Sequence, residues 1–196
     1  TAQVESCATC HSRREEFDEA FRPGDKFTDH YRLAWITAPG QYFADGQILD
    51  EVFVYGSFMH SKMGHASVSC MDCHNPHSGE LVRPVHNNAL CMTCHSAPGL
   101  NGATVIEPAK HSFHPEGSTG NRCVECHMAE RTYMQRDPRR DHGFIIPDPL
   151  LTQELGIPNS CNRCHDDQST EWAIQWVEQW YGEKMDRPER LRTRAV

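Results

Sequence analysis

The sequence predicts a mainly α fold with little regular structure, rich in loops and almost without strand. Three observations support this prediction. Hydrophobic residues make up 38% of the 196 residues and the mean hydropathy is −0.66, so few side chains remain for an ordinary layered core. The chain is interrupted often, by 12 prolines and 13 glycines. Finally, one pentapeptide recurs five times and takes up every cysteine.

The repeated pentapeptide is Cys-x-x-Cys-His. Its copies are Cys7/Cys10/His11, Cys70/Cys73/His74, Cys91/Cys94/His95, Cys123/Cys126/His127 and Cys161/Cys164/His165. Five copies need ten cysteines and the chain has 10, so none is left for a disulfide framework. The pattern is typical of c-type haem attachment, in which both thiols bond to one haem and the histidine binds its iron from the proximal side. Zinc ribbons and thioredoxin-like sites also use Cys-x-x-Cys. A histidine after every second cysteine favours five covalently bound haem c groups instead.

Five haems would give one cofactor per about 39 residues of the 196. At that density porphyrin, not side chains, fills most of the interior. We therefore expect a loop-rich chain wrapped around five haems, with short helices that mostly follow the haem motifs.

The spacing of the motifs suggests three parts. Cys7 and Cys70 are 63 positions apart, whereas later motifs start 21, 32 and 38 positions after one another. We expect an N-terminal segment (1–26) with the first haem, a core (27–182) with haems two to five, and a polar C-terminal tail (183–196). Residues 12–21 predict one or two helical turns. The clearest helix opens at Ser169-Thr170-Glu171, carries three tryptophans at four-residue steps and stops at Gly182.

The histidines suggest the second iron ligand. Eight of the 13 lie outside the motifs, and five haems with two imidazoles each need five of these. The surplus favours bis-histidine coordination over methionine, which would raise the reduction potential. His77 lies too close to His74 to reach around the same porphyrin, so it would bind a neighbouring haem and bring the two into contact. The expected distal ligands are His30, His65, His77, His114 and His142. His60 and His111 are the alternatives to His65. We expect His86 to lie at the surface without a ligand role.

Charge and hydropathy limit the partners and the location. A net charge of −8 disfavours nucleic acid and anionic membranes, which require a basic face. The sequence contains no run of about 18 apolar residues, so it predicts no membrane-spanning helix. The first residues, Thr1-Ala2-Gln3, lack a methionine, as in a chain whose signal peptide has been removed. Haem is attached to this motif outside the cytoplasmic membrane, so we expect an exported protein, extracellular or periplasmic.

Several further segments resemble a known family. They are Asp45-Gly46-Gln47-Ile48, Tyr55-Gly56-Ser57-Phe58, Ser61-Lys62-Met63, Cys70 to Gly79, Arg131-Thr132-Tyr133-Met134, Asp141-His142-Gly143-Phe144 and Gly156 to His165. Over about residues 27–182 they resemble multihaem c-type cytochromes with doubled haem motifs, which are often fused to tetratricopeptide repeats. No such repeats occur in these 196 residues. Related multihaem cytochromes include some that polymerise into extracellular conductive filaments. The resemblance implies electron transfer.

Three functions remain open at this stage. The first is an electron carrier whose closely packed bis-histidine haems conduct along the chain, with copies joining head to tail into a filament. The second is a soluble periplasmic shuttle to a partner reductase, steered by its acidic surface. The third is a redox enzyme with one open iron, which would bind carbon monoxide when reduced. We expect an electron carrier and no catalytic residue.

Overall fold

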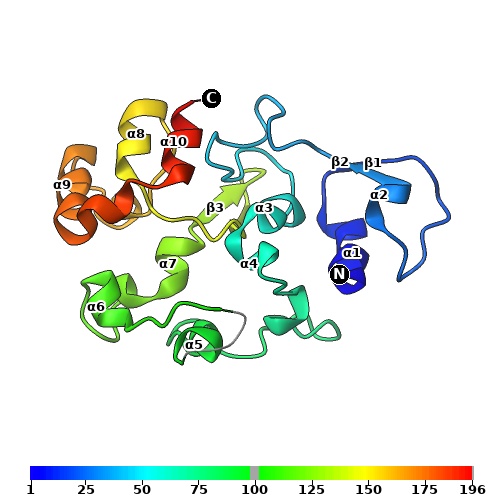
Figure 1. Ribbon diagram of the computed structural model, residues 1–196, viewed down its shortest axis with the longest axis horizontal. Helices are drawn as coiled ribbons and strands as arrows, with labels where there is room; N and C mark the ends of the chain where they lie inside the picture. The colour runs from blue at the N-terminus through cyan, green and yellow to red at the C-terminus, as the bar shows by residue number, and fades with distance from the viewer. Residues whose placement is uncertain (98–101, 196) are drawn as a thin grey trace.

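The computed structural model describes residues 1–97 and 102–195, which form short helices joined by long loops (Figure 1). The α-helices are α1 (Ala2–His11), α2 (Phe27–His30), α3 (Tyr55–His60), α4 (Lys62–His65), α5 (Ala89–His95), α6 (Pro108–Ser112), α7 (Cys123–His127), α8 (Pro149–Leu155), α9 (Thr170–Tyr181) and α10 (Pro188–Arg194). The 3₁₀-helices are η1 (Cys70–Asp72), η2 (Thr119–Asn121), η3 (Cys161–Arg163) and η4 (Gly182–Met185). The strands are β1 (Arg14–Glu16), β2 (Tyr31–Leu33), β3 (Glu130–Tyr133) and β4 (Asp137–Arg140).

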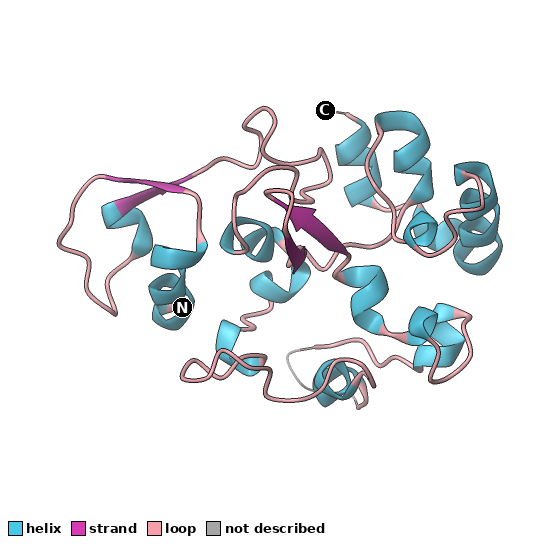
Figure 2. Cartoon of the chain, turned by 180° about the vertical axis from the view of Figure 1, so that it is seen from behind, coloured by secondary structure: helices cyan, strands magenta, loops and turns pink. Residues whose placement is uncertain are grey.

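The elements follow one another around an elongated molecule. An N-terminal lobe of α1, α2, β1 and β2 lies at one end, and α8, α9 and α10 lie at the other (Figures 1 and 2). Between them, α3, α4 and β3 occupy the middle, while α5, α6 and α7 run along one side. The first and last motifs therefore lie at opposite ends of the molecule.

The expected helix over residues 12–21 is wrong. Arg14–Glu16 is instead strand β1, which pairs antiparallel with β2 and matches Arg14 with Leu33. The backbone just before β1 also forms hydrogen bonds with residues far away in the sequence. The Arg13 amide donates to the Val52 carbonyl at 3.1 Å, and the Ala34 amide donates to the Arg13 carbonyl at 2.9 Å. Long-range backbone bonds decide the conformation here, as tertiary context commonly overrides a local pattern.

Strands β3 and β4 form a hairpin that packs on the loop before α3. Tyr133 of β3 joins Tyr42, Ile48 and Val52 in a small buried cluster. Just after β4, Asp141 is 1% exposed and accepts hydrogen bonds from the amides of Ile48 (2.8 Å) and Gly143 (2.7 Å). Burial raises the pKa of Asp141 above its ordinary value. The carboxyl thus ties two loops that lie 93 residues apart in sequence.

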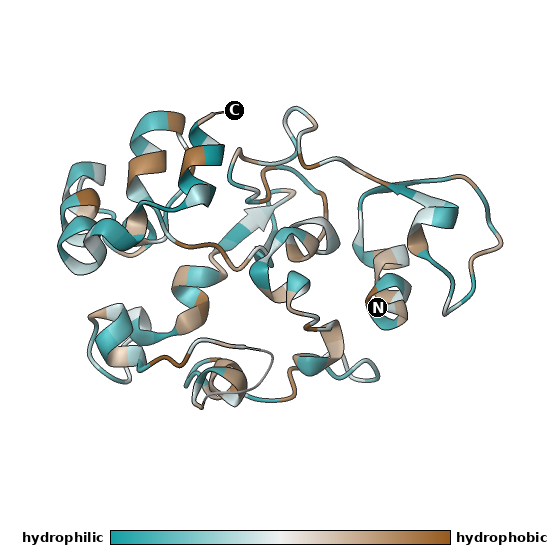
Figure 3. Cartoon of the chain, in the orientation of Figure 1, coloured by the Kyte–Doolittle hydropathy of each residue, from teal (hydrophilic) through white to brown (hydrophobic). Residues whose placement is uncertain are grey.

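Apolar side chains form two small clusters instead of one layer. The second cluster holds Ala8, Phe27 and Tyr31 under the N-terminal lobe. Figure 3 shows hydrophobic residues in short stretches scattered over many elements. The aromatic residues between positions 27 and 59 divide accordingly, because Tyr31 and Tyr42 are buried while Trp35 is 70% exposed.

The expected C-terminal helix is confirmed. Helix α9 begins after Ser169, whose hydroxyl accepts a hydrogen bond from the Trp172 amide at 3.2 Å, and it ends before Gly182. The residues that follow do not extend away from the protein. Helix α10 contacts α8, and the guanidinium of Arg190 donates to both carboxylate oxygens of Asp148 at 2.7 and 2.8 Å.

The Asp148 ion pair should anchor the C-terminal segment. The side chain of Asp148 is 3% exposed and that of Arg190 is 9% exposed. Asp148→Ala would leave Arg190 and Arg187 buried without their anion, so we expect a loss of roughly 3 kcal/mol of folding free energy. The matched control is Glu154→Ala, which breaks the more exposed pair with Arg194 and should cost less than about 1 kcal/mol. Urea unfolding and tryptic release of residues 183–195 measure both effects. Equal losses in the two variants would contradict the anchor.

Candidate haem sites

Each Cys-x-x-Cys-His motif lies on a single helical turn. Helices α1, α5 and α7 each end on the motif histidine, whereas η1 and η3 begin at the first cysteine of the second and fifth motifs and end just before the second cysteine. In those two motifs the histidine amide donates to the carbonyl of the first cysteine four residues earlier, at 2.8 Å for His74 and 3.0 Å for His165. The expectation that helices follow the motifs is wrong, because the helical turns contain them. Positions i, i+3 and i+4 share one helix face, so both thiols and the imidazole can meet one porphyrin.

The thiols of consecutive motifs lie next to one another. All ten cysteines are free. The Cys70 thiol lies close enough to Cys7, and the Cys91 thiol to Cys123, for the neighbour to perturb its pKa. Cys73 is likewise near Cys91 and Cys94, and Cys126 is near Cys161 and Cys164. The motifs are therefore arranged in space in the order of the sequence, from the first to the fifth.

Side chains between the motifs fix this order. Asn88 is buried between the third and fourth motifs, where its amide oxygen accepts from the Cys123 amide at 2.9 Å and its amide nitrogen donates to the Asn121 carbonyl at 2.8 Å. Ser160, just before the fifth motif, donates to the carbonyl of Cys126 in the fourth at 2.7 Å. These hydrogen bonds hold neighbouring motifs at a set separation.

Three motif histidines face a second imidazole. The ring centroids of His74 and His142 are 6.3 Å apart, those of His127 and His111 are 6.0 Å apart, and those of His165 and His114 are 6.2 Å apart. A metal–imidazole bond is about 2 Å, and the ring centroid lies about 1 Å beyond the nitrogen, so two imidazoles on opposite sides of one metal have centroids roughly 6 Å apart. All three pairs fit an iron with two axial histidines.

Backbone carbonyls orient three of these rings, and a fourth carbonyl orients the imidazole of the motif histidine His95 in the same way. Nδ1 lies 2.6 Å from the Ile145 carbonyl in His127, 2.6 Å from the Ser112 carbonyl in His114, 2.9 Å from the Arg140 carbonyl in His142 and 2.8 Å from the Thr104 carbonyl in His95. A carbonyl can only accept, so Nδ1 carries the proton and Nε2 is left to bind a metal. Burial also lowers the pKa of His127 and His142, which favours the neutral, ligating form.

Not every expected distal ligand meets a motif histidine. His114 and His142 do, as does His111, which the sequence ranked behind His65. His65 is exposed and lies near His60, His77 is exposed in the loop after η1, and His86 is exposed.

His30 lies between two carboxylates. Its ring nitrogens are 3.1 Å from Asp18 and 3.5 Å from Asp25, and its ring meets Phe21 edge to face. In the described part of the chain, the rings of His11 and His95 stack on no second imidazole.

The sequence contained a signal for His111. It lies in α6 and His114 follows the helix, with Phe113 between them in a left-handed conformation (φ 56°). This reversal of the chain sends the two imidazoles to different motifs. Two histidines three residues apart across a helix end can therefore serve two neighbouring sites.

A glycine and a tryptophan face hold the last imidazole pair in place. A β-carbon on Gly120 would overlap the ring of His114. On the other side, α9 presents Trp172 to His165 (ring centroids 4.9 Å apart) and Trp180 to His114 (6.0 Å). The tryptophan stripe of α9 is thus a packing face against the fifth motif.

Comparisons with known proteins agree with this site. A model of the class III cytochrome c family matches residues 49–143, which include the second, third and fourth motifs. A search of curated proteins found no match. Among solved structures, the crystal structure of the outer cell wall cytochrome OcwA matches with a TM-score of 0.67 at 17% identity. The match covers 93% of this chain and 53% of that one, so the chain spans about half the length of OcwA.

The motifs, the paired imidazoles and these matches identify the chain as a multihaem c-type cytochrome, which binds haem c covalently. The loop-rich, mainly helical fold is that of such a cytochrome. The match to the class III cytochrome c model supports electron transfer as its activity.

The Gly120 contact can be tested by adding one methyl group. Gly120→Ala should displace the His114 imidazole and convert one haem from low spin to high spin, seen as a high-spin ferric signal of about one haem equivalent by electron paramagnetic resonance. The control is Gly117→Ala on the same loop, where a β-carbon meets no atom within 4 Å. It strains the backbone (φ 78°) but should leave the spectrum unchanged. A low-spin spectrum for Gly120→Ala would contradict the contact.

The His111 pairing makes a separate prediction. His111→Ala should open the iron at His127, giving one high-spin haem and carbon monoxide binding to one haem of the reduced protein. His86→Ala removes an exposed histidine and should bind no more carbon monoxide than the parent protein, whereas His111→Ala should bind one equivalent more. If His111→Ala binds no additional carbon monoxide, a residue other than His111 is the distal ligand of the haem at His127.

Proposed function

We propose that this protein transfers electrons through a continuous chain of five haem c groups. The observation that carries the proposal is the adjacency of thiols in consecutive motifs, which runs from Cys7 to the fifth motif without a gap. Each haem, when bound, holds one electron and passes it on. The polypeptide's part is to fix the haems in sequence order through the helical turns and the Asn88 and Ser160 bonds.

The two ends of the proposed row of haems, at the first and fifth motifs, are exposed to other molecules. Of the ten cysteines, the two exposed ones are Cys10 in the first motif and Cys164 in the fifth. These motifs lie at opposite ends of the molecule (Figure 1). Electrons could therefore enter at one end and leave at the other.

The ligands follow from the paired rings. The five motif histidines are the proximal ligands, and His142, His111 and His114 are the distal ligands for His74, His127 and His165. For His11 and His95 the distal ligand remains a prediction from the sequence, with His65, His77 and His30 as candidates. Two imidazoles per iron favour a carrier over an enzyme, since an iron with both axial positions filled resists binding substrate.

Partners and location are inferred from charge and from the matched structure. The net charge of −8 favours a partner with a basic face, and OcwA is an outer cell wall cytochrome. We infer an exported protein, extracellular or periplasmic. In the described residues no helix is both long and apolar enough to cross a lipid bilayer. The partner is either another copy, joined head to tail through the open ends, or a separate redox protein. Negative-stain images distinguish filaments from discrete molecules.

The haem count can be tested by mass. The intact protein should carry five porphyrin additions, and Cys91→Ser/Cys94→Ser should carry four. Colourless material or a lower count in the parent protein would refute the proposal.

Continuity can be tested by removing one haem. With limiting reductant, the parent should reach a single redox equilibrium in one phase. The variant without the third haem should show two phases, because the remaining haems are split into two groups. The control, Cys7→Ser/Cys10→Ser, removes an end haem and should keep one phase. One phase in the Cys91→Ser/Cys94→Ser variant would contradict a single path.

A further inference from the structure

The first motif opens onto a cavity that the rest of the chain walls. The cavity has a volume of about 300 Å³ and is lined by Cys10 and His11 on one side and by Phe53, Val54 and Arg139 on the other. Its volume is that of a small-molecule site. Arg139 belongs to β4 and reaches this cavity from 129 positions along the chain. The first site is therefore not built by the N-terminal lobe alone.

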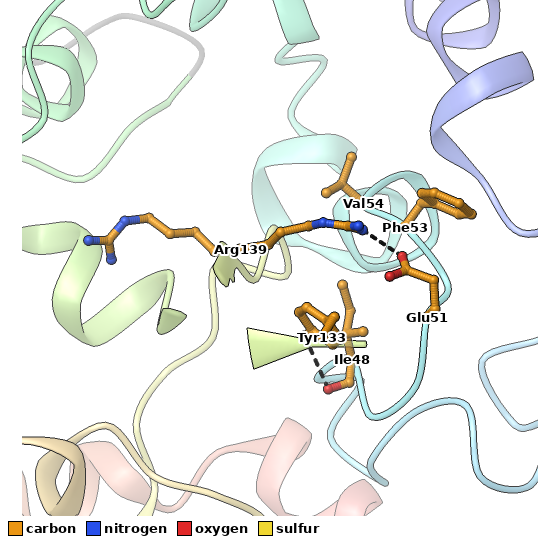
Figure 4. Close-up of a pocket in the computed structure, with 7 residues that line it drawn as sticks. Ile48, Glu51, Phe53, Val54, Tyr133 and Arg139 are labelled. Atoms are coloured by element: carbon orange, nitrogen blue, oxygen red, sulfur yellow. Dashed lines mark hydrogen bonds and ion pairs between the residues drawn. The ribbon is translucent and has the colours of Figure 1, made fainter. Parts of the chain in front are cut away.

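Phe53 and Val54 also bound a smaller hollow on the inner side. This hollow of about 10 Å³ is shared with Ile48, Glu51 and Tyr133 and holds about one water at most (Figure 4). Phe53 and Val54 thus lie between closely packed residues on the hairpin side and the open cavity on the side of the first motif. This asymmetry fits a wall built to face a cofactor.

The backbone of Phe53 supports the same reading. Its φ of 60° lies in the left-handed region, which costs an aromatic residue roughly 1 kcal/mol or more. The preceding Val52 is fully buried in the hairpin cluster, yet Phe53 remains 37% exposed. The left-handed step separates the two side chains, so that the first enters the core and the second lines the cavity.

An ion pair lies at the edge of this wall. The guanidinium of Arg139 is 2.6 Å from a Glu51 carboxylate oxygen, as Figure 4 shows, and Nε donates to Asp137 at 2.7 Å. The side chains of Arg139 and Glu51 are 27% and 20% exposed. Charges that are partly withdrawn from water act over a longer range than fully exposed ones.

We propose that the β3–β4 hairpin completes the haem pocket of the first motif and that Arg139 and Glu51 set the reduction potential of that haem with opposite signs. The inference rests on the proposed function, because it assumes a haem at Cys7 and Cys10. Reduction adds one electron from the donor to ferric iron and lowers the charge of the site by one. Arg139 favours the reduced form and raises the potential, whereas Glu51 disfavours it and lowers the potential.

The experiment is a spectroelectrochemical titration of the holoprotein with charge variants. Arg139→Gln should move one step of the titration to lower potential, and Glu51→Gln should move the same step to higher potential. Arg139→Lys keeps the charge and should leave the step near its parent position. Cys7→Ser/Cys10→Ser identifies the step of the first haem, because this variant lacks that haem and its step.

Opposite shifts in the step that Cys7→Ser/Cys10→Ser removes would establish the proposal. A purely structural role would instead give shifts of the same sign in both variants, and that result overturns it. Unmoved potentials, or shifts confined to another haem, also overturn it. Each variant is first checked for its haem content by mass. A full count with unmoved potentials refutes this inference alone, whereas missing haem in the parent protein refutes the proposed function.

Discussion

The structure depends on one constraint, that two thiols and an imidazole must reach the same haem from a single turn of helix. Cysteines three residues apart followed by histidine satisfy it only when the turn is helical, which explains why every motif forms an α-helical or 3₁₀ turn. The turns can be short because covalent bonds and iron ligation add to their few backbone hydrogen bonds. Elsewhere the chain connects these turns, which accounts for its many loops.

Because the buried apolar clusters among the described residues are small, polar anchors hold much of the fold. Asp141 binds two backbone amides from distant loops, Asp148 holds α10 through Arg190, and Asn88 joins two motif turns. A buried carboxylate is costly unless it is paired or hydrogen-bonded, and both Asp141 and Asp148 are. Hydrogen bonds and ion pairs are directional, so these anchors fix the relative positions of the segments they join more precisely than a small apolar cluster does. This matters in a protein whose function requires cofactors at fixed separations.

The sequence was sufficient wherever the signal was local. Ser169 and Gly182 correctly predicted the bounds of α9, and the spacing within each motif suits the helical turn that its residues adopt. It failed where distant segments decide the outcome. Arg14–Glu16 is a strand only because β2 lies beside it, and His111 was ranked behind His65 because nothing local shows that His127 folds back toward α6. Nor could it place Arg139 beside the first motif, since that contact depends on how the hairpin packs.

The position of His111 and His114 on one short segment has a mechanical consequence. Both belong to a stretch of four residues, and each faces the imidazole of a different motif. This stretch would fix the spacing between the haems proposed at the fourth and fifth motifs, because a shift of either imidazole would displace the other. A thermal motion of α6 would thus move both centres together, and their spacing would vary less than the position of either one.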